Sequence, residues 1–121
     1  MLIQFLQDNN HAEIAYTVSY KDYYITIRQI TPIDCDWHPW FCCYINKKKA
    51  DYTDEELHSL EAHCGITWDG IYRKDWAWSE LTGKPVLGWD YGHGLEEEHK
   101  VSVGSIIKDA HKVIDNIEKI I

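Results

Sequence analysis

Two glycine-containing segments carry the residue types best suited to acid–base chemistry. They are residues 63–68, which begin with His63, and residues 88–94, which contain Asp90 and His93. Imidazole and carboxyl groups exchange protons near neutral pH, and glycine lets the backbone approach a ligand closely. We predict that His63, Asp90 and His93 turn toward one catalytic or binding site. The alternative is a pair of hydrogen-bonded turns in which these side chains are satisfied by the backbone.

Indole rings are the second chemical signal. The chain has six Trp and eight Tyr but only two Phe. Such rings stack on nucleobases, and Arg73 with Lys74 supplies cations for phosphate groups. Residues 75–79 alternate in a way that would expose both of their indoles on one face. We expect the ligand contacts to come from Thr67, Trp68, Arg73, Trp37, Trp40, Trp76 and Trp89. The alternative is that the indoles pack in a core or a subunit interface.

No recognised metal-ligand spacing occurs in either segment, so we expect neither a metal nor a cofactor. The four cysteines are separated by six, zero and twenty residues, which matches no zinc-ribbon or Cys-x-x-Cys pattern. We expect free thiols that pack as small hydrophobic side chains.

Length and charge bound the function. The 121 residues have a mass of 14.2 kDa, which predicts one domain over residues 1–121. Acidic residues outnumber basic ones by 20 to 12, giving a net charge of −8. Long nucleic acids need a basic face, so we exclude them as partners. No apolar run is long enough to span a bilayer, and we expect a cytoplasmic protein.

The strands that must position these residues follow from alternation. Residues 13–20 and 23–30 alternate apolar and polar side chains around Lys21-Asp22, which predicts a hairpin that ends at Pro32. Residues 2–6 add a short strand. Residues 40–46 are almost continuously apolar, as in a central strand buried on both faces. Asp69-Gly70 is expected to form a turn, and residues 86–91 a last strand.

Two helices complete the prediction. Thr53 and Glu56 fit a capping box that starts a short helix ending near His63. From Ser102 onward, apolar residues recur every three or four positions, which predicts an amphipathic helix of four to five turns that packs on the sheet. The fold class is therefore α+β: an antiparallel or mixed sheet of five to six strands, packed by a long C-terminal helix and one short helix.

The two glycine-containing segments also carry a resemblance. Residues 43–45, 63–68 and 87–93 resemble, in order and spacing, a family of small proteins encoded in tailed-phage genomes. That family has a Gly-Tyr-Val run, a His-Gly-Gly-Leu/Ile-Thr-Tyr element, a Gly-Phe-Asp-Cys-Ala-His element and a C-terminal helix. Here Cys64 replaces the first glycine of the second element, and Tyr91-Gly92 replaces Cys-Ala. The resemblance supports His63, Thr67, Asp90 and His93 as site residues.

The resemblance implies a counter-defence role. We expect a homo-oligomer in the cytoplasm of the host cell that binds and sequesters a nucleotide-derived immune signal of the cyclic dinucleotide or ADP-ribose type. One alternative is a metal-independent phosphodiesterase, in which His63 and His93 act as base and acid and Asp90 orients one imidazole. A second alternative is an acidic interaction protein that inhibits a nucleic-acid-binding effector of the host.

Overall fold

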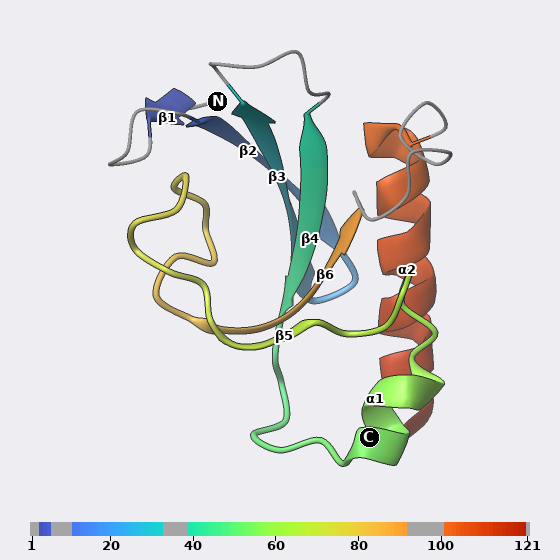
Figure 1. Cartoon of the computed structure of the whole chain (residues 1–121). Helices are drawn as coiled ribbons and strands as arrows, with labels where there is room; N and C mark the ends of the chain where they lie inside the picture. Colours follow the sequence, from blue (N-terminus) through green and yellow to red (C-terminus); the bar gives the residue numbers. More distant parts are fainter. Residues whose placement is uncertain (1–2, 6–10, 33–38, 92–100, 121) are drawn as a thin grey trace.

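A six-stranded sheet and two helices make up the described part of the chain, which in this computed structural model is residues 3–5, 11–32, 39–91 and 101–120 (Figure 1). The strand order is β1-β2-β3-β4-β6-β5, and every neighbouring pair is antiparallel. The predicted α+β class is confirmed. The elements are β1 (Ile3–Phe5), β2 (His11–Tyr20), β3 (Tyr23–Pro32), β4 (Trp40–Asn46), α1 (Asp54–Ser59), β5 (Trp68–Ile71), β6 (Pro85–Tyr91) and α2 (Val103–Ile120).

The hairpin of β2 and β3 forms as alternation predicts. Its ladder runs from Tyr20 opposite Tyr23 to His11 opposite Pro32, and Lys21 takes a left-handed φ of 52° in the two-residue turn. β-branched and aromatic side chains fit this pleated surface. Pro32 ends β3, because proline has no N–H to donate to a ladder.

Strand β4 is central, as its apolar run predicts. It lies between β3 and β6, and Cys43, Tyr44 and Ile45 are all buried. Side chains of a strand alternate between faces, so successive buried residues require cover on both sides of the sheet. In Figure 1, α2 lies on one side and the connection between β5 and β6 lies on the other.

Helix α1 has the predicted capping box but is shorter than expected. The Glu56 N–H donates to Thr53 Oγ1 (3.1 Å), and the Thr53 N–H donates to Glu56 Oε1 (2.9 Å). The prediction that the helix ends near His63 is wrong, since it ends at Ser59. Glu61 and Cys64 have φ of 57° and 58°, a left-handed conformation that no α-helix contains.

The predicted turn at Asp69-Gly70 is also wrong. Both residues lie inside β5 and pair with Leu87 and Val86 of β6. The chain reverses later, where Gly83 has a φ of 79° and its N–H donates to Tyr72 O (2.8 Å). Pairing with β6 outweighs the local turn preference of an Asp-Gly pair.

Helix α2 begins and packs as its periodicity predicts. The Ser105 N–H donates to Ser102 Oγ and the Ser102 N–H donates to Ser105 Oγ, which caps the first turn. Its buried stripe covers the helix side of the sheet; the residues are Ile106, Ala110, Val113, Ile114 and Ile117. Within the described residues, neither helix has the length and apolar character needed to cross a membrane.

The opposite side of the sheet is covered by an irregular connection of residues 72–84, which we call the strap. The Tyr72 N–H donates to Lys84 O (3.0 Å), closing the strap at its base. Inside it, Tyr72 and Leu81 are fully buried and form a second core with Tyr44 and Val86. The sheet therefore has a helix face and a strap face.

Candidate functional site

Two of the predicted catalytic residues, His63 and Asp90, lie on opposite faces of the sheet. The His63 ring stacks on the Tyr91 ring, with centroids 4.6 Å apart and planes at 17°, and Tyr91 belongs to the core of the helix face. Asp90 precedes Tyr91 in β6 and pairs with Cys42 of β4, so its side chain points to the strap face. His93 and Trp37 lie outside the described residues. The structure thus separates His63 from Asp90.

Trp89 lies in the core rather than at a surface. Its side chain is 1% exposed on the helix face, and its Nε1–H donates to the Tyr91 hydroxyl oxygen (2.9 Å). The Tyr91 hydroxyl then donates to Asp109 Oδ2 of α2 (2.7 Å). Burial, and the hydrogen bond to Asp109, raise the pKa of Tyr91. The chain of hydrogen bonds ties β6 to α2, and a ligand does not reach the Trp89 indole in this arrangement.

The strap face gathers the other predicted aromatic contacts. Trp68 and Trp76 are half-buried, with ring centroids 5.2 Å apart and planes at 58°. Trp76 also contacts Tyr44 (5.2 Å) and meets Tyr72 edge to face (5.1 Å, 88°). Trp40 is half-buried opposite Ile30 of β3. The rings in mutual contact, which we call the aromatic surface, come from β4, β5 and the strap: Tyr44, Trp68, Tyr72 and Trp76. Trp40 lies on the same face of the sheet.

Arg28 lies under this aromatic surface, a position that the sequence analysis missed. Its guanidinium carbon is 4.1 Å from the Trp76 ring centroid, and its Nη1–H donates to the Tyr44 hydroxyl (2.8 Å). Its Nε–H donates to Glu13 Oε1 (2.6 Å), although Arg28 is only 6% exposed. Burial alone would lower the pKa of Arg28, but the hydrogen bond to Glu13 raises it above its ordinary value. Arg28 is therefore a fixed, buried cation.

Glu13 joins the sheet to the strap. It is fully buried, and its Oε1 also accepts from the Ala77 N–H (3.3 Å). The Tyr72 hydroxyl donates to Ala77 O (2.6 Å), so both backbone groups of Ala77 are held in place. Glu13 Oε2 has no hydrogen-bond partner among the described residues. A buried ion pair costs desolvation that only good geometry offsets. Through these bonds, the Glu13–Arg28 ion pair fixes the position of the strap over the sheet.

Gly88 makes room for this arrangement. A Cβ atom at Gly88 would lie 2.6 Å from Tyr44 Cδ1, so only glycine lets the Tyr44 ring lie across β6. Trp68 of β5 pairs with Gly88 in the ladder. The glycine of the second predicted segment therefore serves an aromatic side chain.

Arg73, in the strap, and Thr67, just before β5, are both exposed. Arg73 is exposed and forms two hydrogen bonds with Asp75, from Nε to Oδ1 (2.8 Å) and from Nη2 to Oδ2 (2.9 Å). The guanidinium of Arg73 lowers the pKa of Asp75. Thr67 is exposed, and its N–H donates to Gly88 O (2.9 Å). A ligand phosphate that bound Arg73 would have to displace the Asp75 carboxylate from its guanidinium.

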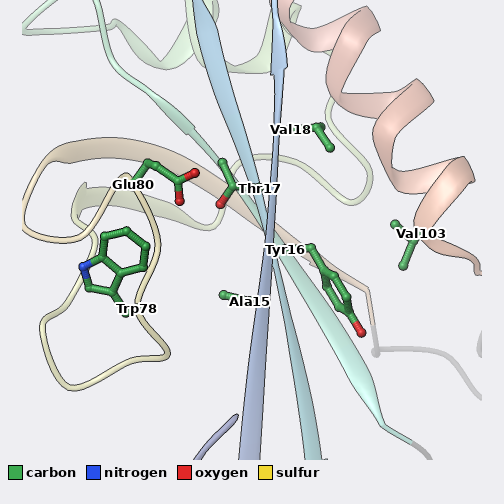
Figure 2. A pocket seen from close by; sticks show the side chains of 7 residues that line it. All are labelled: Ala15, Tyr16, Thr17, Val18, Trp78, Glu80 and Val103. Carbon is green, nitrogen blue, oxygen red and sulfur yellow. The ribbon is translucent and has the colours of Figure 1, made fainter. Parts of the chain in front are cut away.

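The two strap indoles have different environments, so the prediction that both are exposed on one face is wrong. Trp76 packs on the aromatic surface, whereas Trp78 is 57% exposed. Trp78 lines a hollow of about 680 Å³ along β2 instead (Figure 2). Among the described residues, none that was predicted for the site lines that hollow.

The described cysteines, Cys42, Cys43 and Cys64, are free. Cys42 points to the strap face beside Asp90, and burial raises its pKa to about 11. It is a thiol at neutral pH and not an activated nucleophile. Among the described residues, no group of three or more His, Cys, Asp or Glu side chains lies where it could hold a metal ion.

No protein-family model, curated protein or solved structure matches this chain. The site is therefore described by its geometry alone. That geometry brings Trp68, Trp76, Trp40 and Asp90 to one face and adds Arg28 beneath them. The sequence did contain a signal for Arg28, which lies in the middle of a predicted strand. A cation in an interior strand is buried, and a buried cation needs a carboxylate partner.

Proposed function

We propose that the chain is a binding module that stacks a small nucleotide-type ligand on the strap face and holds it without cleaving it. The observation that carries the proposal is the half-exposed pair of Trp68 and Trp76 above the buried cation Arg28. A base that stacks on an indole contributes about 1–3 kcal/mol, and the stacking tolerates different bases. Arg28 polarises the surface from below and keeps Trp76 in a fixed orientation.

Binding is favoured over hydrolysis by the placement of the polar groups. Asp90 points to the strap face and the His63 ring stacks on the helix face, so Asp90 is not placed to orient that imidazole. Cys42 is protonated and offers no nucleophile. Among the described residues, the strap face therefore gathers stacking surfaces and does not bring His63 beside Asp90. This favours the sequestration that the phage-family resemblance implies, with a cyclic dinucleotide or an ADP-ribose-type molecule as the ligand class.

The test is retention and release with the purified full-length chain. Cyclic dinucleotides and ADP-ribose are incubated with the protein, unbound molecules are removed, and the protein is heated. Chromatography of the supernatant then identifies what was held. Return of an intact nucleotide supports sequestration, and return of cleavage products supports the phosphodiesterase alternative. If neither class of nucleotide is retained, the proposal is wrong.

Two strap tryptophans provide a matched pair of variants. Trp76→Ala removes a ring from the aromatic surface, and we expect the Kd of the retained nucleotide to rise about 5- to 150-fold. Trp78→Ala removes the exposed ring outside that surface and should leave Kd unchanged. Trp68→Leu, with Trp68→Phe as the conservative variant, repeats the test in β5 without altering the strap. Equal effects of Trp76→Ala and Trp78→Ala would place the ligand elsewhere.

A further inference from the structure

Within the described part of the chain, one edge of the sheet is unpaired along the second half of β2. Strand β1 pairs only with residues 12–14 of β2, and in the described part of the chain no strand pairs with residues 16–20 on that side. The hollow of about 680 Å³ follows this edge and has walls on both faces of β2. Figure 2 shows Trp78 and Glu80 on one side of the strand and Val103 on the other.

The ladder shows which backbone groups point outward. The Tyr24 N–H donates to Asn46 Oδ1 on β4, so even-numbered residues of β3 face β4 and odd-numbered ones face β2. Tyr23 and Ile25 pair with Tyr20 and Val18, which therefore form the β2–β3 bonds. Thr17 and Ser19 consequently direct their N–H and C=O groups away from the sheet. Such an edge is a template for another strand.

The two edges of the sheet differ in their protection. At the far edge, β5 has four residues, carries the charged Asp69, and its Trp68 Nε1–H donates to Ile71 O. Residues 15–20 of β2 read Ala-Tyr-Thr-Val-Ser-Tyr and contain neither charge nor proline. Val18 is 38% exposed. Natural edges are normally protected by charges, prolines or short length, and this segment has none of these features.

We infer that this edge of β2 pairs antiparallel with β2 of a second copy of the chain, about a two-fold axis at Val18. The uncharged run of residues 15–20 favours a second copy at this place, because two proteins of net charge −8 repel each other least where the contacting strands carry no charge. An isologous contact also requires a self-complementary surface. In this register Tyr16 lies opposite the partner's Tyr20, and Thr17 lies opposite the partner's Ser19.

The register follows from the neighbouring strand. Centring the axis on Thr17 would bring the partner's Tyr20 beside Ile14, where Ile3 of β1 already pairs. Centring it on Val18 confines the overlap to residues 16–20. The aromatic pair and the two Val18 side chains then lie on the helix face, and aromatic and β-branched cross-strand pairs stabilise a sheet. Trp78, Glu80 and Val103 flank the added strand on its two faces.

The test is the oligomeric state of the full-length chain, measured by light scattering after gel filtration. We expect a mass twice the 14.2 kDa of the chain. Val18→Lys and Ser19→Pro should each give the monomer mass, because they put a charge or a missing donor at the contact. Ile71→Lys, at a residue 47% exposed on the far edge, is the matched control and should stay dimeric. Circular dichroism and thermal melting confirm that each variant is folded.

The register has its own test. If two β2 strands pair about a two-fold axis at Val18, the two Val18 residues form a non-hydrogen-bonded pair. Their Cα atoms then lie about 4.5 Å apart, a distance that a disulfide can span. Val18→Cys, in a Cys64→Ser background, should form a covalent dimer on mild oxidation, whereas Ile71→Cys should not. A monomeric wild type would overturn the inference. A dimer that survives Val18→Lys and Ser19→Pro, or one that Ile71→Lys also breaks, would overturn it as well.

Discussion

The two faces of the sheet are covered in different ways. Helix α2 buries a stripe of five apolar residues against the helix face, and the Tyr91–Asp109 hydrogen bond adds a polar contact beside them. The strap, which is irregular, covers the other face with Tyr72, Leu81 and Trp76 over the ion pair of Glu13 and Arg28. Apolar contact is non-directional, whereas a buried ion pair requires fixed geometry. The helix face supplies stability, and the strap face fixes a unique arrangement of aromatic rings.

The strap face should be the more sensitive of the two to loss of one partner. Arg28→Ala leaves Glu13 as a buried carboxylate without its cation, and we expect it to cost about 3–5 kcal/mol. Replacing both partners, Glu13→Leu with Arg28→Met, should recover most of that loss because no buried charge remains. The free energy of unfolding in urea measures both. A double variant as unstable as Arg28→Ala would contradict this account of the pair.

The helix face should respond in proportion to the apolar volume removed. Ile114 is fully buried in the core, so Ile114→Ala should cost about 2–5 kcal/mol and Ile114→Val about 0.5–1.5 kcal/mol. Urea unfolding again provides the measurement. Such a graded series distinguishes this face from the strap face, where the second substitution restores stability. An abrupt loss with Ile114→Val would show that the helix face also depends on exact geometry.

Gly88 tests whether close packing on the strap face is required. Gly88→Ala places a Cβ 2.6 Å from the Tyr44 ring and should cost about 1–3 kcal/mol. Gly70→Ala, where the nearest atom is 3.6 Å away in Trp68, is the control and should be close to neutral. Adding Tyr44→Leu to Gly88→Ala should recover part of the loss. Equal costs for the two glycine substitutions would exclude the Tyr44 contact as the cause.

The sequence was sufficient for the elements that local patterns determine. Alternation located β2 and β3, a continuous apolar run located β4, and three- and four-residue spacing located α2. The sequence patterns gave wrong or missing predictions where tertiary contacts determine the local structure. Asp69-Gly70 became strand because β6 pairs with it, and the partner of Arg28 lies fifteen residues away in the chain, on the adjacent strand. Of the predicted site residues, His63 and Asp90 were separated because strand alternation puts Asp90 and Tyr91 on opposite faces.

The smallest effect belongs to the ion pairs at the solvent-exposed margin of the helix face. Lys21, in the β2–β3 turn, donates to Asp115 Oδ1 (2.8 Å) and Glu118 Oε1 (2.7 Å) of α2. Hydrogen bonds to Asp115 and Glu118 raise the pKa of Lys21, and those from Lys21 and Tyr20 lower the pKa of Asp115. The Lys21, Asp115 and Glu118 side chains are 43–45% exposed, so Lys21→Met should lower Tm only slightly, and added salt should reduce the difference.

The pH dependence of that small difference has a definite sign. The pKa of Asp115 is lower in the folded chain than its ordinary value of 3.8, so this carboxylate stabilises the fold at pH values above 3.8. The contribution is lost as the pH falls through the folded-state pKa. The pKa of Lys21 is higher in the folded chain than its ordinary value of 10.5, so the ammonium group stabilises the fold at pH values below 10.5. This contribution is lost only in stronger alkali. The difference in Tm between wild type and Lys21→Met should therefore be constant near neutral pH and vanish in acid. A difference that persists in acid, after Asp115 and Glu118 are protonated, would show that Lys21 does not act through these carboxylates.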